Sequence, residues 1–434
     1  MAGLSAAQKL VENGLSILIL EARPRTGGRV LADSPNTGYA IDLGPEFIHG
    51  KPRQIWDIID RQNLPVYEVS NEHWYKHNGV IAGSSDFFEG VDSVMGKLPR
   101  AQEEHPEDLS FAAFLEAYCD NDPDEHKRAA TSFIEGFNAA ISDRIGVSGL
   151  NIENDAEGKL GEETYRLLSG YRSLLAEFEK TLPKSAIQLD SVVKQINWSS
   201  GHVQIKGMSS GAPFSAEGRA AIVTLPLGVL KCSENSPSFV RFSPALSSKT
   251  DALEKLEMGE VVKVSLQFKQ RVWENAKLQT HDGETKDGRE LCFLHSEHEY
   301  FPTWWTMRPL HVPLIVGWCA GRRAGGLRGR DKEFILKHAL ESLSSALNLS
   351  VESLKSSLVE CHYHDWQQDP FSLGAYSYVG VSGANAAKVL AEPLENSLFF
   401  AGEHTNWQGI WATVHGAMET GVRAANQVIA ALAD

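Results

Sequence analysis

A short helix, a glycine stop, a strand and an acid follow one another in residues 1–21, and this order restricts the fold most. Apolar residues recur at helical spacing in residues 3–12, which predicts an amphipathic helix. Gly14 ends it, because glycine adopts the left-handed conformation without steric cost. The apolar run 15–20 (LSILIL) predicts a buried strand, with Glu21 at its carboxyl end. A helix that leads into a buried strand is typical of a βαβ unit in an α/β domain.

The spacing between Gly3 and Glu21 matches half of a dinucleotide-binding fingerprint. In G-x-G-x-x-G units, an acid about 20 residues after the glycine-rich turn binds the ribose hydroxyls. Gly3 then corresponds to the last glycine, which lets helix and strand pack closely. The printed sequence holds neither the first strand nor the two glycines whose N–H groups contact the pyrophosphate. On these residues alone, dinucleotide binding and a plain βαβ packing unit are about equally open.

Two further motifs indicate which cofactor this half-fingerprint would bind. Residues 21–29 read EARPRTGGR, in which paired glycines permit close backbone approach and arginines suit phosphate. Residues 42–50 read DLGPEFIHG. Together the two strings resemble the flavin-containing amine oxidases, and polyamine oxidases and lysine-specific histone demethylases look most similar. The resemblance implies FAD contacts from Gly3, Glu21, Arg23, Gly28, Arg29 and Gly44.

The resemblance also concerns the start of the sequence. Residues 1–30 look like the FAD-binding βαβ unit of that family without its first strand and phosphate turn. We therefore expect either a true start upstream of residue 1 or a chain that is impaired in FAD binding. A third alternative, from another class, is a truncated homologue that folds without FAD and has no activity.

Three later segments extend the resemblance over nearly the whole chain: 259–263, 366–378 (WQQDPFSLGAYSY) and 399–425 (FFAGEHTNWQGIWATVHGAMETGVRAA). The last is the most specific, because a short strand, Gly402-Glu403, a loop and a helix from about Thr413 follow one another. The positive end of that helix would face the pyrimidine edge of a flavin and favour its reduction. The resemblance implies further FAD contacts from Val193, Trp366, Gly402, Glu403, Thr413 and Val414.

Lys263 lies in a predicted strand, 258–268, on the face opposite Val262 and Val264. Periodicity alone predicts a solvated lysine on the outer face of a sheet. The resemblance implies instead that Lys263 is catalytic and holds a water against flavin N5.

The resemblance implies three more residues at the reacting end of the site. Tyr376 would form one wall of an aromatic cage that orients the amine. The second wall is Thr413, as in the demethylases and some polyamine oxidases, which leaves room for longer or secondary amines. His49 matches a histidine at the active-site mouth that can hydrogen-bond a substrate nitrogen. Ala375 stands where covalent members carry cysteine, so we expect non-covalent FAD. Ordinary core packing is the alternative for Tyr376 and Trp366, and a packed or surface histidine is the alternative for His49.

We expect two domains, each built from separate segments. The FAD-binding domain, Rossmann-like and α/β, would use residues 1–70, 165–245 and 365–434. The substrate domain, α+β around a mixed sheet, would use residues 71–164 and 246–364. Within them we predict a hairpin over 196–206 and helices over 131–145, 165–182 and 332–348.

Composition excludes several other classes of protein. A net charge of −15 argues against a nucleic-acid partner. No apolar run reaches the roughly 18 residues of a membrane span, and no secretory signal is recognisable. The five cysteines are scattered without C-x-x-C spacing, so neither a disulfide framework nor a metal site is expected. A reducing, cytoplasmic setting fits these features; the oligomeric state stays unknown.

The reaction that the resemblance implies is FAD-dependent oxidation of an amine C–N bond. Hydride passes to N5, water hydrolyses the imine, and O2 reoxidises the flavin to give hydrogen peroxide. The expected partners are a small-molecule (poly)amine and O2. An L-amino-acid oxidase is the nearest alternative, since Arg308, Arg322 or Arg323 could clamp a carboxylate. A histone demethylase is less expected, because 434 residues leave no room for its helical insertion and extra domain.

Overall fold

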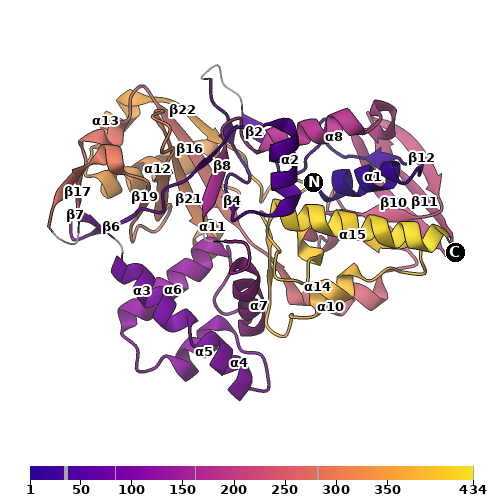
Figure 1. Cartoon of the computed structure of the whole chain (residues 1–434), viewed down its shortest axis with the longest axis horizontal. Coiled ribbons are helices and arrows are strands. Elements are labelled where there is room, and N and C mark those ends of the chain that lie inside the picture. The colour runs from indigo at the N-terminus through magenta and orange to yellow at the C-terminus, as the bar shows by residue number, and fades with distance from the viewer. Residues whose placement is uncertain (34–37, 84, 162, 281–282, 434) are drawn as a thin grey trace.

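The computed structural model describes residues 1–33, 38–83, 85–161, 163–280 and 283–433. Its first helix and its last helix lie side by side, in indigo and yellow (Figure 1). These are α1 (Ala2–Glu12) and α15 (Val414–Ala433). Small residues make the close approach possible, since a Cβ on Gly421 would overlap the backbone of Ala2.

Short parallel strand pairs lie beside α1 and α15. β1 (Ile19–Leu20) pairs with β9 (Ile187–Gln188), and β13 (Ala221–Val223) pairs with β24 (Leu398–Phe400). The predicted helix is present, but the predicted buried strand is wrong in part: only two residues of the run 15–20 pair as a strand, and both are half-buried. The remainder of that run pairs with no strand among the described residues and lines a large cavity instead.

An antiparallel meander closes this side of the molecule. β10 (Ser191–Ser199), β11 (His202–Ser209) and β12 (Ala212–Gly218) follow one another, which confirms the predicted hairpin. β14 (Arg241–Ser243) adds to β10 in parallel.

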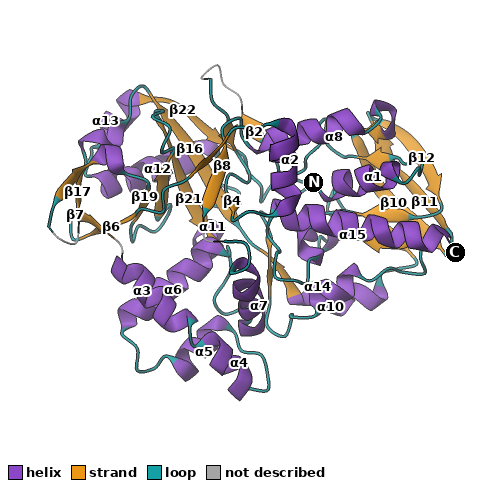
Figure 2. Cartoon of the chain, in the orientation of Figure 1, coloured by secondary structure: helices purple, strands orange, loops and turns teal. Residues whose placement is uncertain are grey.

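The other side of the molecule is built around a nine-stranded sheet, at the left of Figure 2. Its strands, in spatial order, are β18 (Thr285–Asp287), β17 (Lys277–Gln279), β7 (Val80–Gly83), β6 (His73–His77), β19 (Phe293–His295), β20 (Thr303–Thr306), β21 (Leu314–Ala320), β16 (Val261–Phe268) and β22 (Leu358–Tyr363). The predicted helix 332–348 is α12 (Lys332–Leu347), and it packs on one face together with Val262 and Val264. The opposite face of β16, which carries Lys263, therefore turns to the inside of the molecule.

Five helices form a separate group below the sheet in Figure 1. They are α3 (Ser85–Met95), α4 (Leu98–Glu104), α5 (Phe111–Tyr118), α6 (Asp124–Phe137) and α7 (Val147–Glu157). Within the described ranges, no helix combines the length and apolar character that a bilayer crossing requires.

Two predicted helices are wrong in part. The segment 165–182 begins as strand β8 (Thr164–Leu167), because its backbone pairs antiparallel with β4 (Ile48–His49) on one side and β5 (Val66–Glu68) on the other. Helix α8 (Leu175–Thr181) starts only after a turn at Gly170, whose φ is 73°. The predicted helix 131–145 ends at Phe137, since the chain turns at Ala139 with a φ of 50°.

The predicted strand 258–268 is also interrupted. β15 (Leu256–Met258) pairs with β23 (Ser377–Val379), whereas β16 starts at Val261. Gly259 lies between them, and its amide N donates to the Tyr376 carbonyl at 2.7 Å. A Cβ at Gly259 would come within 3.0 Å of that oxygen, so the glycine allows the two segments to touch.

Candidate active site

One cavity of about 1600 Å³ extends from α1 and β10 to the inner face of the nine-stranded sheet. Pockets for drug-sized ligands measure roughly 300–1,000 Å³, so this space suits a dinucleotide together with a second small molecule. Every site residue predicted from the sequence lines it: Gly3, Glu21, Arg23, Gly28, Arg29, Gly44, His49, Val193, Lys263, Trp366, Tyr376, Gly402, Glu403, Thr413 and Val414. The fold thus brings segments from both ends of the chain to one site.

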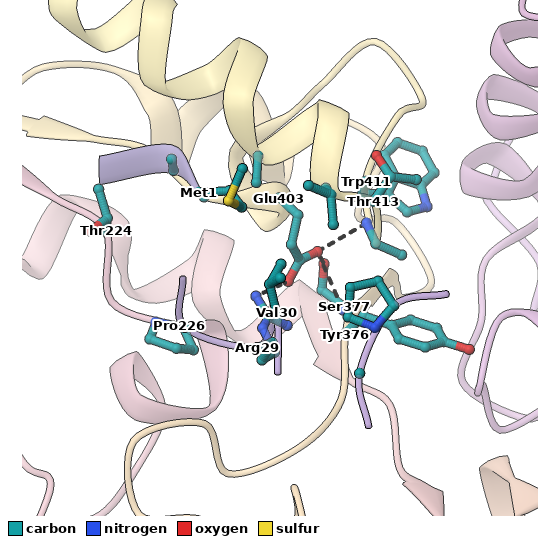
Figure 3. A pocket seen from close by; sticks show the side chains of 18 of the residues that line it. Met1, Arg29, Val30, Thr224, Pro226, Tyr376, Ser377, Glu403, Trp411 and Thr413 are labelled. Atoms are coloured by element: carbon teal, nitrogen blue, oxygen red, sulfur yellow. Dashed lines mark hydrogen bonds and ion pairs between the residues drawn. The ribbon is translucent and has the colours of Figure 1, made fainter. Parts of the chain in front are cut away.

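The amino end of α1 forms one end of the cavity. Backbone N–H groups in the first helical turn have no partner within the helix, and they carry positive potential. Gly3 packs against the loop after β13, since a Cβ there would meet Thr224 Oγ1 at 3.3 Å (Figure 3). Glu21 ends β1 and accepts the amide N–H of Arg23 at 2.9 Å. An anionic ligand end is therefore favoured beside the helix, with an acid within reach of hydroxyls.

The turn at residues 27–28 crosses the middle of the cavity. Gly27 and Gly28 have φ values of 95° and 60°, which glycine adopts without strain. Arg23 pairs with Asp369 at 2.6 Å. Arg29 pairs with Glu403 at 3.0 Å. Both arginines thus fasten the N-terminal loop to C-terminal segments.

Glu403 is 3% exposed, which excludes a surface acid. Its carboxylate accepts the hydroxyl of Ser377 at 2.6 Å and the amide N–H of Ala412 at 3.0 Å (Figure 3). Burial opposes ionisation, but the charge of Arg29 and these hydrogen bonds outweigh it and hold the pKa of Glu403 below its usual value. Glu403 is therefore an ionised group that joins three segments at the centre of the site.

Lys263 is 6% exposed, so it is not a solvated lysine. Its ammonium pairs with Glu46 at 2.6 Å and donates to the Gly44 carbonyl at 3.1 Å. Gly44 cannot be larger, because a Cβ would overlap the carbonyl oxygen of Arg29. Trp366 packs beside it and donates from Nε1 to the Leu43 carbonyl at 2.8 Å.

Tyr376 lies at the same end of the cavity and donates its hydroxyl to the Phe137 carbonyl at 2.7 Å. Thr413 caps α15, since its Oγ1 accepts the amide N–H of Gly416 at 2.9 Å. The cap fixes the amino end of α15 at the cavity wall, next to Glu403 (Figure 3). Trp411, which the sequence reading passed over, also lines the wall here and is buried.

Two histidines line the cavity here, the half-buried His49 and the buried His415. Burial lowers the pKa of His49 to about 4, so its imidazole is neutral. Its ring meets that of Phe137 edge-on, with centroids 5.8 Å apart. Burial likewise lowers the pKa of His415 to about 3, and its Nε2 has no hydrogen-bond partner among the described residues.

The comparisons with known proteins decide which chemistry this geometry serves. The family model described as flavin-containing amine oxidoreductase matches residues 1–429. The chain belongs to this family.

Individual relatives of this amine oxidase agree with the match. Polyamine oxidase 3 of Oryza sativa subsp. japonica is 28% identical, over 98% of this chain and 87% of that protein. Lysine-specific histone demethylase 1 homolog 3 of Arabidopsis thaliana is 26% identical over 99% of this chain, but the match covers 29% of that protein. A putrescine oxidase solved with putrescine bound shares the fold, with a TM-score of 0.80, 18% identity and coverage of 99% and 97% of the two chains. The predicted family, fold class, enzyme class and flavin cofactor are therefore confirmed.

The described residues of this amine oxidase fit a flavin dinucleotide. At Gly28, no atom lies within 4 Å of the place where a Cβ would stand, so the backbone of the glycine turn is open to the cavity. The Nε2 of His415 is a buried polar atom without a hydrogen-bond partner in the described part of the chain. Two helices, α1 and α15, present their amino ends to the same cavity.

Sequence reasoning missed three acidic positions of the oxidase. Glu46 pairs with Lys263, and its only signal was a charge inside an apolar motif. Glu153 lies on α7, lines the cavity and accepts the side-chain amide of Asn138 at 2.7 Å. Glu157, one helical turn later, lines it too. Burial raises the pKa of both α7 acids, and the charge of Glu157 adds to the effect on Glu153.

Proposed function

We propose that this chain is an FAD-dependent amine oxidase that holds its cofactor non-covalently and oxidises a C–N bond of a polyamine. The observation that carries this proposal is the single cavity that joins the amino end of α1 to Lys263, Tyr376 and the amino end of α15. A bound FAD would supply the two-electron acceptor for the α-hydrogen of the amine, and O2 would be the final oxidant, reduced to peroxide.

The chain's own residues would bind and orient the cofactor. Glu21 and Val193 would contact the nucleoside half near α1, while Gly28 and Gly44 leave room for close approach. The capped amino end of α15, at Thr413, would stabilise negative charge on the ring. All five cysteines are described residues, and none of them lines the cavity, which supports non-covalent binding.

Other residues would position the substrate and exclude water. Tyr376 and Trp411 present aromatic surface to the cavity, where a ring can attract a substrate cation or pack on its carbon chain. His49 is neutral, so it can accept a hydrogen bond from a substrate nitrogen. Lys263 would supply a fixed ammonium donor at the opposite wall.

Glu153 and Glu157 favour a substrate with a second amino group. Within the described part of the chain, neither carboxylate forms an ion pair with a cation. A buried acid without a counterion has a raised pKa, and an arriving ammonium would restore its charge. The distal ammonium of a polyamine supplies that charge, whereas a simple monoamine does not.

An L-amino-acid oxidase has less support. A carboxylate clamp needs an arginine in the cavity wall, and the described lining includes none of Arg308, Arg322 and Arg323. Arg308 pairs with Glu290 at 3.0 Å, and Arg322 pairs with Asp143 at 2.6 Å.

We further propose the domain division predicted from the sequence, with its boundaries at 70, 164, 245 and 364. The nine-stranded sheet draws all its strands from 71–164 and 246–364, which supports this division.

The test is to purify the full chain, record its flavin spectrum, and add spermine, spermidine, putrescine, benzylamine or leucine without oxygen. We expect a yellow protein that polyamines bleach and that releases peroxide when air returns. Release of the flavin on denaturation would support non-covalent binding. A colourless protein after soaking with excess FAD would overturn the proposal, and bleaching by leucine alone would favour the amino-acid oxidase.

A further inference from the structure

Glu46 is a carboxylate shared by two buried cations. Its Oε2 lies 2.6 Å from the Lys263 ammonium, and its Oε1 lies 2.9 Å from Arg166 Nε. The indole N–H of Trp305 donates to Oε1 at 3.0 Å. Glu46 is thereby fixed from three sides, by strands β16, β8 and β20.

The cluster is almost dry. The side chains of Lys263, Glu46 and Arg166 are 5%, 5% and 2% exposed. In such surroundings an ion pair is screened little, and loss of one partner leaves an uncompensated buried charge. The position of the Lys263 ammonium is therefore tied to the charge of Glu46.

Counting donors shows what Lys263 has left for a ligand. An ammonium has three N–H donors. Glu46 takes one, and the Gly44 carbonyl takes a second at 3.1 Å. One donor remains, and Lys263 lines the cavity.

We propose that Glu46 is a positioning residue that keeps the Lys263 ammonium charged and holds it with one donor directed to the cavity. This inference rests on the proposed function only where it concerns turnover. It assigns Lys263 the part of a fixed cationic donor, because an amine held by a carboxylate at 2.6 Å does not act as a free base.

Other titratable groups face the cluster from neighbouring elements. Burial raises the pKa of Asp42, next to β8, to about 7, and the charges of Lys263 and Arg166 oppose that rise. Burial raises the pKa of Tyr67 on β5 to about 12. Burial raises the pKa of Cys292 to about 11. The pKa of Glu46 is instead lowered, because its burial is outweighed by the charges of Lys263 and Arg166, so its removal is best measured on both sides of pH 7.

The experiment compares Glu46→Gln, Glu46→Asp and a matched control, Glu177→Gln, in the purified full chain with and without added FAD. Glu177 is also a buried acid in an ion pair, with Arg61 at 3.1 Å, but it does not line the cavity. Lysine reactivity is read by reductive methylation with formaldehyde and cyanoborohydride and by peptide mass spectrometry, relative to the exposed Lys337.

We expect Lys263 methylation at pH 8 to rise about tenfold or more in Glu46→Gln, since a lysine without its counterion releases its proton more readily. Glu46→Asp should restore most of the protection, and Glu177→Gln should match the parent chain. In turnover, Glu46→Gln should shift the alkaline limb of the kcat profile to lower pH. The Lys263→Met background should abolish the further effect of Glu46→Gln.

Equal Lys263 labelling in the parent chain and Glu46→Gln would overturn the inference, as would an unshifted pH profile in a folded variant. If Glu46→Gln does not fold, Trp305→Phe removes one hydrogen bond to Glu46 and provides the same labelling readout. A labelling change without any amine oxidation would refute the proposed function and leave the Glu46–Lys263 coupling standing.

Discussion

Cations in one part of the cavity wall have carboxylate partners, whereas the two acids that α7 contributes to the wall have no cationic partner among the described residues. On one side, each of the cavity-lining cations Arg23, Arg29 and Lys263 is matched by a carboxylate of the protein. On α7, the buried Glu153 and the exposed Glu157 have no cationic partner among the described residues. Paired buried charges hold segments together, whereas an unpaired buried acid has its charged form destabilised until a ligand cation arrives. The contrast separates structural charges from those available to a substrate.

The largest effect should come from breaking a pair on the structural side. Arg29→Met leaves Glu403 buried and without its counterion. We expect a loss of about 3 kcal/mol in the free energy of unfolding and a lower flavin content. Chemical denaturation and the ratio of flavin to protein absorbance measure both. Arg100→Met, which breaks an exposed pair with Glu104, should cost less than about 1 kcal/mol. Equal losses in the two variants would contradict the contrast.

On the substrate side, Glu153→Gln should alter specificity more than stability. Loss of a charged partner for a distal ammonium should lower kcat/KM for spermine or putrescine by about 10- to 100-fold and leave monoamines unaffected. Asp155→Asn on the same helix is the control, because Asp155 is exposed and does not line the cavity. A uniform decrease for all amines would show that Glu153 supports the fold rather than the substrate.

His49 offers a test of how the stability of the cavity wall depends on pH. Its pKa is about 4 in the folded chain against about 6.5 unfolded, so the unfolded state binds the proton first as the pH falls. Stability from neutral His49 is complete above pH 6.5 and is lost between pH 6.5 and 4. Between pH 7 and 5 the parent chain should lose about 2 kcal/mol more than His49→Gln. Identical acid sensitivity in the two proteins would show that His49 is accessible to protons.

The smallest effect should come from the cap of α15. Thr413→Ala removes the hydroxyl that accepts the Gly416 amide N–H, and we expect a loss of about 1 kcal/mol. Thr413→Ser keeps the hydroxyl and should retain the stability of the parent chain, as followed by thermal unfolding. If Thr413→Ser were as unstable as Thr413→Ala, the methyl group rather than the cap would be the stabilising part.

The parts of the site that depend on local backbone geometry were predictable from the sequence. Gly27 and Gly28 adopt left-handed conformations, and the order strand, Gly402-Glu403, loop, helix is continuous in the chain. Such features depend on neighbouring residues, so a motif records them directly. The family resemblance then assigned them to a flavin, and the family match confirms that cofactor.

Partnerships across the chain were not predictable. The sequence pattern predicts a helix where the structure has β8. The register of β8 against β4 brings Arg166 towards Glu46. The break at Gly259 likewise depends on contact with the Tyr376 backbone. Periodicity describes one segment at a time and carries no information about such pairings.

The sequence by itself therefore determined the α/β class through local pattern, and the family and its flavin cofactor through the resemblance of its motifs, because such motifs record local backbone requirements. Only the tertiary structure decided which charges neutralise one another. Lys263 is an ion-paired donor, and Glu403 is a buried carboxylate that links three segments. Glu153 has no cationic partner among the described residues. These roles depend on partners in other segments of the chain. In a dry interior the partner within hydrogen-bonding distance sets the charge state and role of each group.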